Sequence, residues 1–333
     1  MKHVIIGAGA AGIRAAKTIK KIDAGAEVVV CGEEGFFPYS RYKLTDFFCD
    51  ELTESEMFYA PADFFKDIDV NLRKGQFVKT INPREKTIKL FHNEVVPYDK
   101  LLIATGGTPR LGPVLRPYEK LIQRYYSLKD ILLLKKKLPG ISTCIVSGQG
   151  LSSLDLLCGL CRLGKQVTYI IKGERADWSL VDPNLYNDLL ELMIEKNVEI
   201  ITRDRITAIE KTGDRYRVST LKQQQLTADI VFAWDNYMPN ISIIKDTGIE
   251  KKLGILVNEQ METTVDDIYA AGDCVEIYHQ GIRNYLINFG WPNALEQGEI
   301  AGKSMTGQKS TYKLHESLDF ELMGKAIRAR WWK

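Results

Sequence analysis

Three short apolar runs along the chain each end at a glycine. Residues 3–6 lead into a first glycine turn, which the helix-forming run 13–20 follows. Residues 143–146 lead into a second turn, after which a helix is expected to begin near Ser152. Residues 267–271 end at a third glycine. Apolar strands that glycine turns join to helices predict an α/β fold, in which ligands bind at the carboxyl ends of parallel strands.

The first turn has the spacing G-x-G-x-x-G, with Gly7, Gly9 and Gly12. In such a turn the first glycine permits a tight bend, the second lets a pyrophosphate approach, and the third lets the helix pack against the strand. A second apolar strand, residues 27–31, follows the helix and leads to Glu34, where a carboxylate can bind ribose hydroxyls. The strand, turn and helix context therefore predicts a dinucleotide site.

The second turn repeats this pattern in a weaker form, with Gly148 and Gly150 but Ser153 in the place of the third glycine. A further strand is expected at residues 166–171. Two interpretations stay open, a nicotinamide dinucleotide site and a nucleotide-binding half kept as scaffold, because fold alone does not establish function. We take Gly148, Gly150, Ser153 and Asp155 as the candidate contacts to NADH or NADPH.

Composition narrows the class of protein. The 333 residues, 45% of them hydrophobic, are enough for two domains of ordinary size. The 45 basic and 43 acidic residues are interspersed, which disfavours a nucleic-acid partner. No apolar run reaches the roughly 18 residues of a membrane span, and we expect no signal peptide because the first strand directly follows Met1. We therefore expect a cytoplasmic protein, with no membrane association, whose six cysteines are reduced thiols.

Further motifs carry a resemblance to a known family. They read Pro-Tyr-Ser-Arg at residues 38–41, Leu-Ile-Ala-Thr-Gly-Gly at 102–107 and Asp-Ile-Tyr-Ala-Ala-Gly-Asp-Cys at 267–274. Together with the glycine turns, they make the chain resemble the FAD-dependent pyridine nucleotide-disulfide oxidoreductase superfamily. The branch with NADH:rubredoxin reductase, bacterial ferredoxin reductases and the flavin part of nitrite reductase is most similar. The resemblance covers residues 2–307.

The resemblance implies that FAD is the bound cofactor and that NADH or NADPH is the electron donor. It assigns the pyrophosphate to the first glycine turn, the adenosine ribose to Glu34, a flavin-side phosphate to Arg41 and the ribityl chain to Asp273. The implied FAD contacts are Gly7, Gly9, Gly12, Glu34, Arg41, Ala104, Thr105, Gly106, Gly272 and Asp273.

The expected architecture is two Rossmann-like, three-layer ββα domains, with the NAD(P) domain inserted in the FAD domain. The FAD-binding domain is expected at residues 1–112 and 242–308, and the NAD(P)-binding domain at residues 113–241. A short tail, residues 309–333, stands where relatives carry an interface domain. The tail ends in two tryptophans among cations, and either packs on its own domain or docks a partner.

Cysteine chemistry at the flavin is disfavoured. Relatives that use a redox thiol carry it in the segment that here spans residues 36–44, which has no cysteine. Cys49 follows on an apolar helix face, which indicates a buried structural thiol. Cys158 and Cys161 are expected to pack on one face of a helix rather than to bind a metal or act as a redox pair.

The nicotinamide end departs from the family pattern. Asn236 stands where relatives have a glycine, and the bulky Trp234 and Tyr237 flank it, which predicts hindered approach of the nicotinamide. Beyond strand 166–171, Lys172 and Arg175 favour a 2′-phosphate and NADPH, whereas Glu174 favours a free ribose hydroxyl and NADH.

The sequence therefore predicts an FAD-dependent NAD(P)H oxidoreductase that passes electrons to a small iron-sulfur carrier of the ferredoxin or rubredoxin type. We expect Lys43 to lie near the flavin ring and stabilise its reduced form electrostatically. The alternative is an electron-relay subunit of a larger complex with a vestigial NAD(P) site. An oxidase that reduces oxygen or peroxide ranks lower, because the flavin-proximal cysteine is missing. The oligomeric state stays open.

Overall fold

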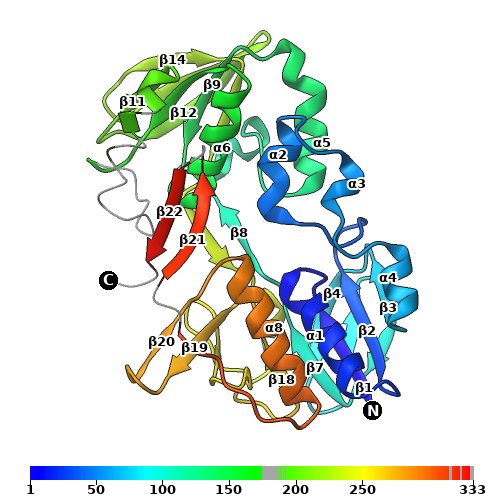
Figure 1. The fold of residues 1–333 in the computed structure, drawn as a ribbon. Helices are drawn as coiled ribbons and strands as arrows, with labels where there is room; N and C mark the ends of the chain where they lie inside the picture. Colours follow the sequence, from blue (N-terminus) through cyan, green and yellow to red (C-terminus); the bar gives the residue numbers. More distant parts are fainter. Residues whose placement is uncertain (175–186, 188–189, 192, 315–316, 323–324, 331–333) are drawn as a thin grey trace. The chain divides into compact units, whose positions relative to one another are not determined.

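The structure is a computed structural model that describes residues 1–174, 187, 190–191, 193–314, 317–322 and 325–330 (Figure 1). Contacts between residues divide the chain into two compact units. Unit 1 contains residues 1–40, 58–108 and 238–314, and unit 2 contains residues 41–57, 109–237 and 315–333. Among the described residues, no helix is both long enough and apolar enough to cross a lipid bilayer.

The core of unit 1 is a parallel sheet with the strand order β18-β7-β1-β2-β3. Its strands are β1 (Lys2–Ile6), β2 (Glu27–Gly32), β3 (Asn71–Lys74), β7 (Lys100–Ile103) and β18 (Ile268–Ala270). In the register, Val4 lies beside Val29 of β2 and Leu101 of β7, and all three side chains are buried. Continuous apolar runs of this kind are typical of strands that are buried on both faces.

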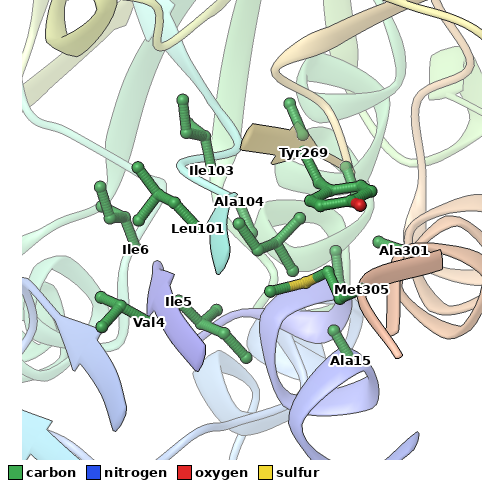
Figure 2. Close-up of a cluster of buried hydrophobic side chains, with 14 of the residues drawn as sticks. Val4, Ile5, Ile6, Ala15, Leu101, Ile103, Ala104, Tyr269, Ala301 and Met305 are labelled. Carbon is green, nitrogen blue, oxygen red and sulfur yellow. The ribbon is translucent and has the colours of Figure 1, made fainter. Parts of the chain in front are cut away.

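Helices α1 (Ala10–Ile22) and α8 (Trp291–Met305) pack closely together in unit 1. Two glycines of α8 permit this approach, since a Cβ at Gly298 would overlap the carbonyl of Ala11 and one at Gly302 would lie 2.9 Å from the carbonyl oxygen of Ala15. Figure 2 shows Ala15, Ala301 and Met305 beside apolar side chains of β1 and β7. The two helices therefore cover the sheet, and α8 holds the first turn of α1 in place.

Unit 1 also contains two small sheets and short connecting elements. One of them is a three-stranded antiparallel meander, with its first hairpin turn at residues 83–86. These elements are β4 (Val78–Asn82), β5 (Thr87–Leu90), β6 (Val95–Pro97), β17 (Ile255–Val257), β19 (Val275–His279), β20 (Asn284–Leu286), α4 (Ala62–Asp67) and η4 (Ser242–Ile244).

Unit 2 repeats the architecture with a parallel sheet of order β11-β10-β9-β15. Its strands are β9 (Thr143–Ser147), β10 (Gln166–Ile170), β11 (Val198–Ile201) and β15 (Ile230–Ala233). Unit 2 also contains an antiparallel sheet and the helices α5 and α6. These elements are β12 (Ile206–Thr212), β13 (Arg215–Thr220), β14 (Gln225–Ala228), α5 (Leu128–Lys137), α6 (Leu151–Arg162), η2 (Arg116–Leu121) and η3 (Leu138–Gly140).

One segment groups differently from the expected domain boundaries. Residues 41–57 fall in unit 2, although they lie within the segment 1–112 that we expected to belong to the FAD domain throughout. They form η1 (Arg41–Lys43), α2 (Leu44–Phe48) and α3 (Glu54–Met57). The physical reason is a set of contacts between α2 and helices α5 and α6, among them a hydrogen bond of 2.6 Å from Thr45 to Asp155. The assignment of FAD and NAD(P) to the domains stays a prediction.

The remaining elements belong to the connections and the C-terminal part. The glycine- and proline-rich link after residue 105 contains β8 (Gly107–Arg110), which pairs with β16 (Asn236–Pro239). The C-terminal part forms an antiparallel pair, β21 (Ser317–Leu322) and β22 (Lys325–Arg330). The terminal tryptophans lie outside the described residues.

Candidate dinucleotide-binding sites

The predicted FAD contacts of unit 1 gather at one edge of its sheet. Gly7 follows β1, Glu34 follows β2, Ala104 follows β7 and Gly272 follows β18 closely. These strands are parallel neighbours in the sheet, so their carboxyl ends, and the loops after them, meet at the same edge. This edge is where ligands bind in open α/β sheets.

The three glycines of the first turn meet different neighbours. Gly7 has a φ of +114°, and a Cβ there would overlap the carbonyl group of Ala104. A Cβ at Gly12 would overlap the carbonyl oxygen of Gly7. A Cβ at Gly9, in contrast, would meet no atom within 4 Å. Gly7 and Gly12 are therefore needed for packing, whereas Gly9 borders open space.

That open space lies at the beginning of helix α1. Gly9 is the N-cap residue of α1, and no side chain caps the helix there. The first N–H groups of a helix lack intrahelical partners and favour an anion. The residues present therefore fit a dinucleotide pyrophosphate.

Polar contacts hold the other predicted FAD residues in place. Glu34 accepts a hydrogen bond of 2.8 Å from the Tyr39 hydroxyl. Thr105 donates from its hydroxyl to the carbonyl oxygen of Asn240 (2.7 Å), and the Asn240 amide donates back to the carbonyl oxygen of Thr105 (3.0 Å). Gly106, with a φ of +65°, completes this turn. The roles of these residues toward FAD stay predictions.

The turn after β18 depends on a residue that sequence reasoning missed. The fully buried Gln297 of α8 accepts a hydrogen bond of 2.7 Å from the N–H of Gly272. Asp273 accepts one of 3.1 Å from the N–H of Gly290, the N-cap of α8. A glutamine among mostly small and apolar residues on the buried face of a helix is the sequence signal that marks such a contact.

Both predicted flavin-site cations belong to unit 2. Arg41 donates to the carbonyl oxygen of Tyr126 (2.9 Å), and its guanidinium lies 4.5 Å from the centre of the Tyr126 ring. The Lys43 ammonium lies 6.0 Å from the centre of the Tyr42 ring. Their contacts to the flavin stay predictions.

Hydrogen bonds from two side chains stabilise the second glycine turn. The fully buried Ser153 donates from its hydroxyl to the carbonyl oxygen of Gly150 (2.8 Å). The Tyr169 hydroxyl donates to the carbonyl oxygen of Gly148 (2.9 Å). Gly150 has a φ of +77° and, like Gly9, no atom within 4 Å of an added Cβ. Ser153 thus stands in the place of the third glycine and stabilises the turn with its hydrogen bond.

Trp234 packs directly on this turn. A Cβ at Gly148 would lie 2.5 Å from Cε2 of the indole, and the indole N–H donates to the carbonyl oxygen of Gln149 (3.2 Å). Trp234 is 6% exposed. Trp234, which flanks Asn236 in the sequence, therefore contacts the first glycine of the turn. Asn236 itself is exposed.

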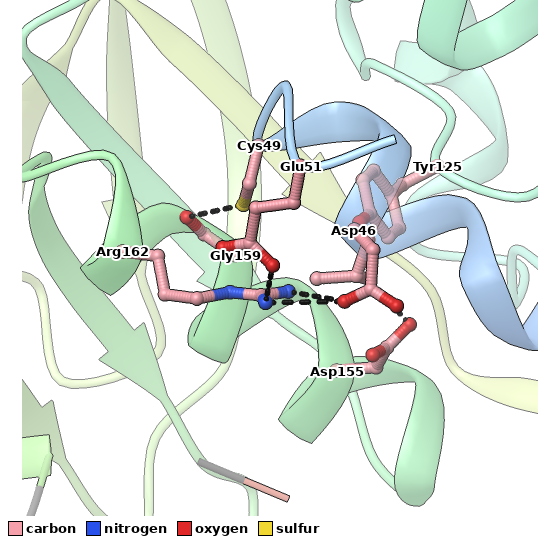
Figure 3. Close-up of polar contacts among 8 residues, drawn as sticks. Asp46, Cys49, Glu51, Tyr125, Asp155, Gly159 and Arg162 are labelled. Carbon is pink, nitrogen blue, oxygen red and sulfur yellow. Dashed lines mark hydrogen bonds and ion pairs between the residues drawn. The ribbon is translucent and has the colours of Figure 1, made fainter. Parts of the chain in front are cut away.

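Asp155, a predicted NAD(P) contact, hydrogen-bonds to a residue of α2. Its carboxylate accepts the hydrogen bond from Thr45, whose hydroxyl also lies 2.7 Å from the Tyr125 hydroxyl. Desolvation raises the pKa of Asp155 to about 6. Figure 3 shows this network beside the ion pairs of Arg162 with Asp46 and Glu51. The role of Asp155 in NAD(P) binding stays a prediction.

The described cysteines are free thiols. Cys49 is half-buried at the C-cap of α2 and not buried on a helix face as expected, and desolvation raises its pKa to about 11. Desolvation also raises the pKa of Cys158 and Cys161, which are buried on α6 as expected. A raised pKa disfavours the thiolate that redox and metal chemistry require. Among the residues that the structure describes, no cluster of His, Cys, Asp and Glu is arranged to hold a metal ion.

Comparisons with known proteins cover most of the chain. Residues 1–298 match the family described as pyridine nucleotide-disulphide oxidoreductase. An NADH-rubredoxin oxidoreductase of Clostridium acetobutylicum is 30% identical over 312 residues, which is 93% of this chain and 76% of the relative. A nitric oxide reductase FlRd-NAD(+) reductase of Klebsiella pneumoniae is 28% identical over 279 residues, 82% of this chain and 72% of the relative.

Solved structures show the same fold. A ferredoxin reductase from Rhodopseudomonas palustris superposes with a TM-score of 0.91 at 21% identity, covering 98% of this chain and 81% of that protein. This likeness confirms the predicted α/β, Rossmann-like fold class.

Proposed function

Because the chain belongs to the pyridine nucleotide-disulphide oxidoreductase family, we propose that it is an FAD-dependent enzyme that passes electrons from NAD(P)H to a small iron-sulfur carrier protein. The observation that carries this proposal is the carboxyl edge of the unit 1 sheet, where four strand ends meet beside the open space at Gly9. That edge offers a flavin dinucleotide both room and hydrogen-bond donors.

Residues of unit 1 would hold FAD. The N–H groups at the start of α1, after Gly9, would bind the pyrophosphate, Glu34 the adenosine ribose and Asp273 the ribityl chain. When bound, FAD supplies the conversion between two-electron chemistry with a nicotinamide and one-electron chemistry with a carrier. The protein orients the reactants and provides the electrostatic environment.

The names of the relatives support an iron-sulfur carrier as the acceptor. One relative is named for rubredoxin and another for FlRd, and a structural neighbour is named for ferredoxin. The chain itself adds that residues 36–44 contain no cysteine and that the Cys49 thiol has a raised pKa. Both observations disfavour reduction of a disulfide or peroxide through a flavin-proximal thiol. No observation favours the alternative, a relay subunit.

We also infer a cytoplasmic location. Six free cysteines, five of them buried, are typical of a reducing compartment. Labelling of cell fractions with an antibody against the chain checks this inference, and recovery from a membrane or extracellular fraction would contradict it.

An anaerobic titration tests the function. The FAD-loaded protein is titrated with NADH and, separately, with NADPH while the absorbance of oxidised flavin is followed. We expect near-stoichiometric bleaching by at least one coenzyme, and subsequent reduction of an added rubredoxin or ferredoxin, seen as loss of the carrier's visible absorbance. Flavin that dithionite reduces but neither coenzyme reduces would contradict the proposal and favour the relay subunit.

A further inference from the structure

An ion pair spans the end of the central strand β9 in unit 2. In the sheet register, Ile170 of β10 and Ala233 of β15 both lie beside Ser147, the last residue of β9. Lys172 stands two residues beyond Ile170, and Asp235 stands two residues beyond Ala233. Lys172 and Asp235 form an ion pair. Since β10 and β15 flank β9 on opposite sides, this pair crosses the chain where the second glycine turn begins.

Asp235 is the fixed member of the pair. Its carboxylate accepts a hydrogen bond of 2.5 Å from the N–H of Gly112, and its own N–H donates to the carbonyl oxygen of Arg110 (2.9 Å). The side chain of Asp235 is 16% exposed, whereas that of Lys172 is 39% exposed. Asp235 therefore sets where the Lys172 ammonium lies.

The position of Lys172 gives this pair a consequence for coenzyme choice. In a nucleotide-binding βαβ unit, residues just beyond the second strand bind the adenosine ribose, with a carboxylate for a free 2′-hydroxyl and a cation for a 2′-phosphate. Lys172 is a cation in that place, and Arg175, the other candidate cation of this loop, lies outside the described residues. Because Lys172 already pairs with Asp235, a 2′-phosphate would have to displace a fixed carboxylate and would be repelled by it.

The second charged residue in this loop is less constrained. Glu174 pairs with Arg203, and their side chains are 72% and 65% exposed. Exposed pairs of this kind are weak, so Glu174 is available to a ribose hydroxyl.

We propose that Asp235 makes this chain select NADH over NADPH by holding Lys172 away from a 2′-phosphate. The proposal rests on the proposed function, because it concerns the coenzyme of the same enzyme. Asp235 lies in the loop after β15 and pairs with Lys172. In this proposal it determines coenzyme specificity through that cation.

The test is Asp235→Asn in the FAD-loaded full chain. Asparagine keeps an oxygen that accepts from Gly112 but loses the charge that holds Lys172. Binding is measured by calorimetry on the oxidised protein, without turnover, with NAD⁺, NADP⁺, 5′-AMP and adenosine 2′,5′-bisphosphate as probes. We expect Asp235→Asn to tighten NADP⁺ and the bisphosphate about tenfold, because a freed cation gains a charge-assisted hydrogen bond. NAD⁺ and 5′-AMP should change by less than about threefold.

Lys172→Met provides the control. In the wild-type background it leaves the Asp235 carboxylate without its cation, so we expect NADP⁺ to bind no more tightly than it does to the wild type, and this result does not depend on how well Asp235→Asn folds. In the double variant it should abolish the gain. A gain that survives in the double variant, a tighter binding of NADP⁺ by Lys172→Met alone, or a wild-type preference for NADP⁺ would each overturn the proposal.

The same measurements separate this proposal from the proposed function. A wild-type protein that NADH reduces, but whose Asp235→Asn variant shows no tighter NADP⁺ binding, would overturn the coenzyme proposal alone. A wild-type protein that binds neither coenzyme and is reduced by neither would overturn both.

Discussion

A glycine in a phosphate-binding turn is required either because the fold leaves no room for a Cβ or because a ligand must approach the backbone. The first turn separates these two requirements. Gly7 and Gly12 are surrounded by backbone atoms, whereas Gly9 borders open space. In the second turn Trp234 packs on Gly148, so the first glycine there accommodates a side chain of the protein itself. The same spacing thus serves different purposes in the two turns.

Replacing these glycines should separate FAD binding from folding. Gly9 has a φ of −83°, which alanine adopts readily. We expect Gly9→Ala to lower FAD affinity at least tenfold, because the methyl group enters the space of the pyrophosphate, while the apoprotein loses less than about 1 kcal/mol of unfolding free energy. Gly12→Ala, whose Cβ would overlap the carbonyl oxygen of Gly7, should destabilise the apoprotein by about 1–3 kcal/mol.

Quenching of flavin fluorescence and urea unfolding measure the two quantities. Unchanged FAD affinity in Gly9→Ala would show that the pyrophosphate lies elsewhere. A strongly destabilised Gly9→Ala apoprotein would show that Gly9, like Gly12, is a packing residue.

At the scale of elements, the sequence predicts those features that depend on residues close together in the chain. The strands before Gly7, Gly148 and Gly272 end close to where the apolar runs end, because burial on both faces and glycine turns are local signals. The grouping of residues 41–57 with unit 2 and the hydrogen bond from the Gly272 N–H to Gln297 are not local, because they join residues far apart in sequence. No periodicity encodes such contacts.

The contact between α2 and α6 shows what such a long-range pairing does. The Thr45 hydroxyl has one proton, which it donates to Asp155, so the Tyr125 hydroxyl donates to Thr45 in turn. Arg162 adds hydrogen bonds to Asp46 (3.1 Å) and Glu51 (2.7 Å). These polar contacts attach a helix of the 41–57 segment to unit 2.

This network should make stability depend on pH. Desolvation raises the pKa of Asp155 from 3.8 to about 6, so the folded protein binds a proton more tightly than the unfolded chain does. The unfolding free energy should therefore fall as the pH rises through this window, by up to about 3 kcal/mol. Asp155→Asn cannot ionise and should be more stable than the wild type at about pH 8, with little gain at about pH 4.

Urea unfolding at saturating FAD across this pH range measures the effect. Glu51→Gln is the matched control, because it removes a carboxylate of the same network that pairs with Arg162, and it should not stabilise the protein at any pH. Equal or lower stability of Asp155→Asn at pH 8 would show that the ionised carboxylate is favourable in the fold.

At the scale of the whole molecule, the two units have separate buried cores. One hydrophobic cluster, which includes Val4, Leu101 and Ile268, draws all its members from unit 1. Another, which includes Ile145, Ile170 and Val231, draws all its members from unit 2. Each sheet therefore buries its own apolar surface, and a ligand held by one unit acts first on the stability of that unit.

Calorimetric unfolding should reveal this division. We expect the apoprotein to unfold in more than one transition, because two cores of this size need not melt together. FAD at about a hundred times its dissociation constant stabilises the unit that binds it by about 2.7 kcal/mol, which raises the transition of unit 1 by about 5–10 °C. The transition of unit 2 should shift by less. At the same FAD concentration, Gly9→Ala should reduce the FAD-dependent shift by about half or more and leave both apoprotein transitions in place. A single transition that FAD moves as a whole would instead show that the two units unfold as one cooperative body, and FAD would then stabilise the second core as strongly as the first.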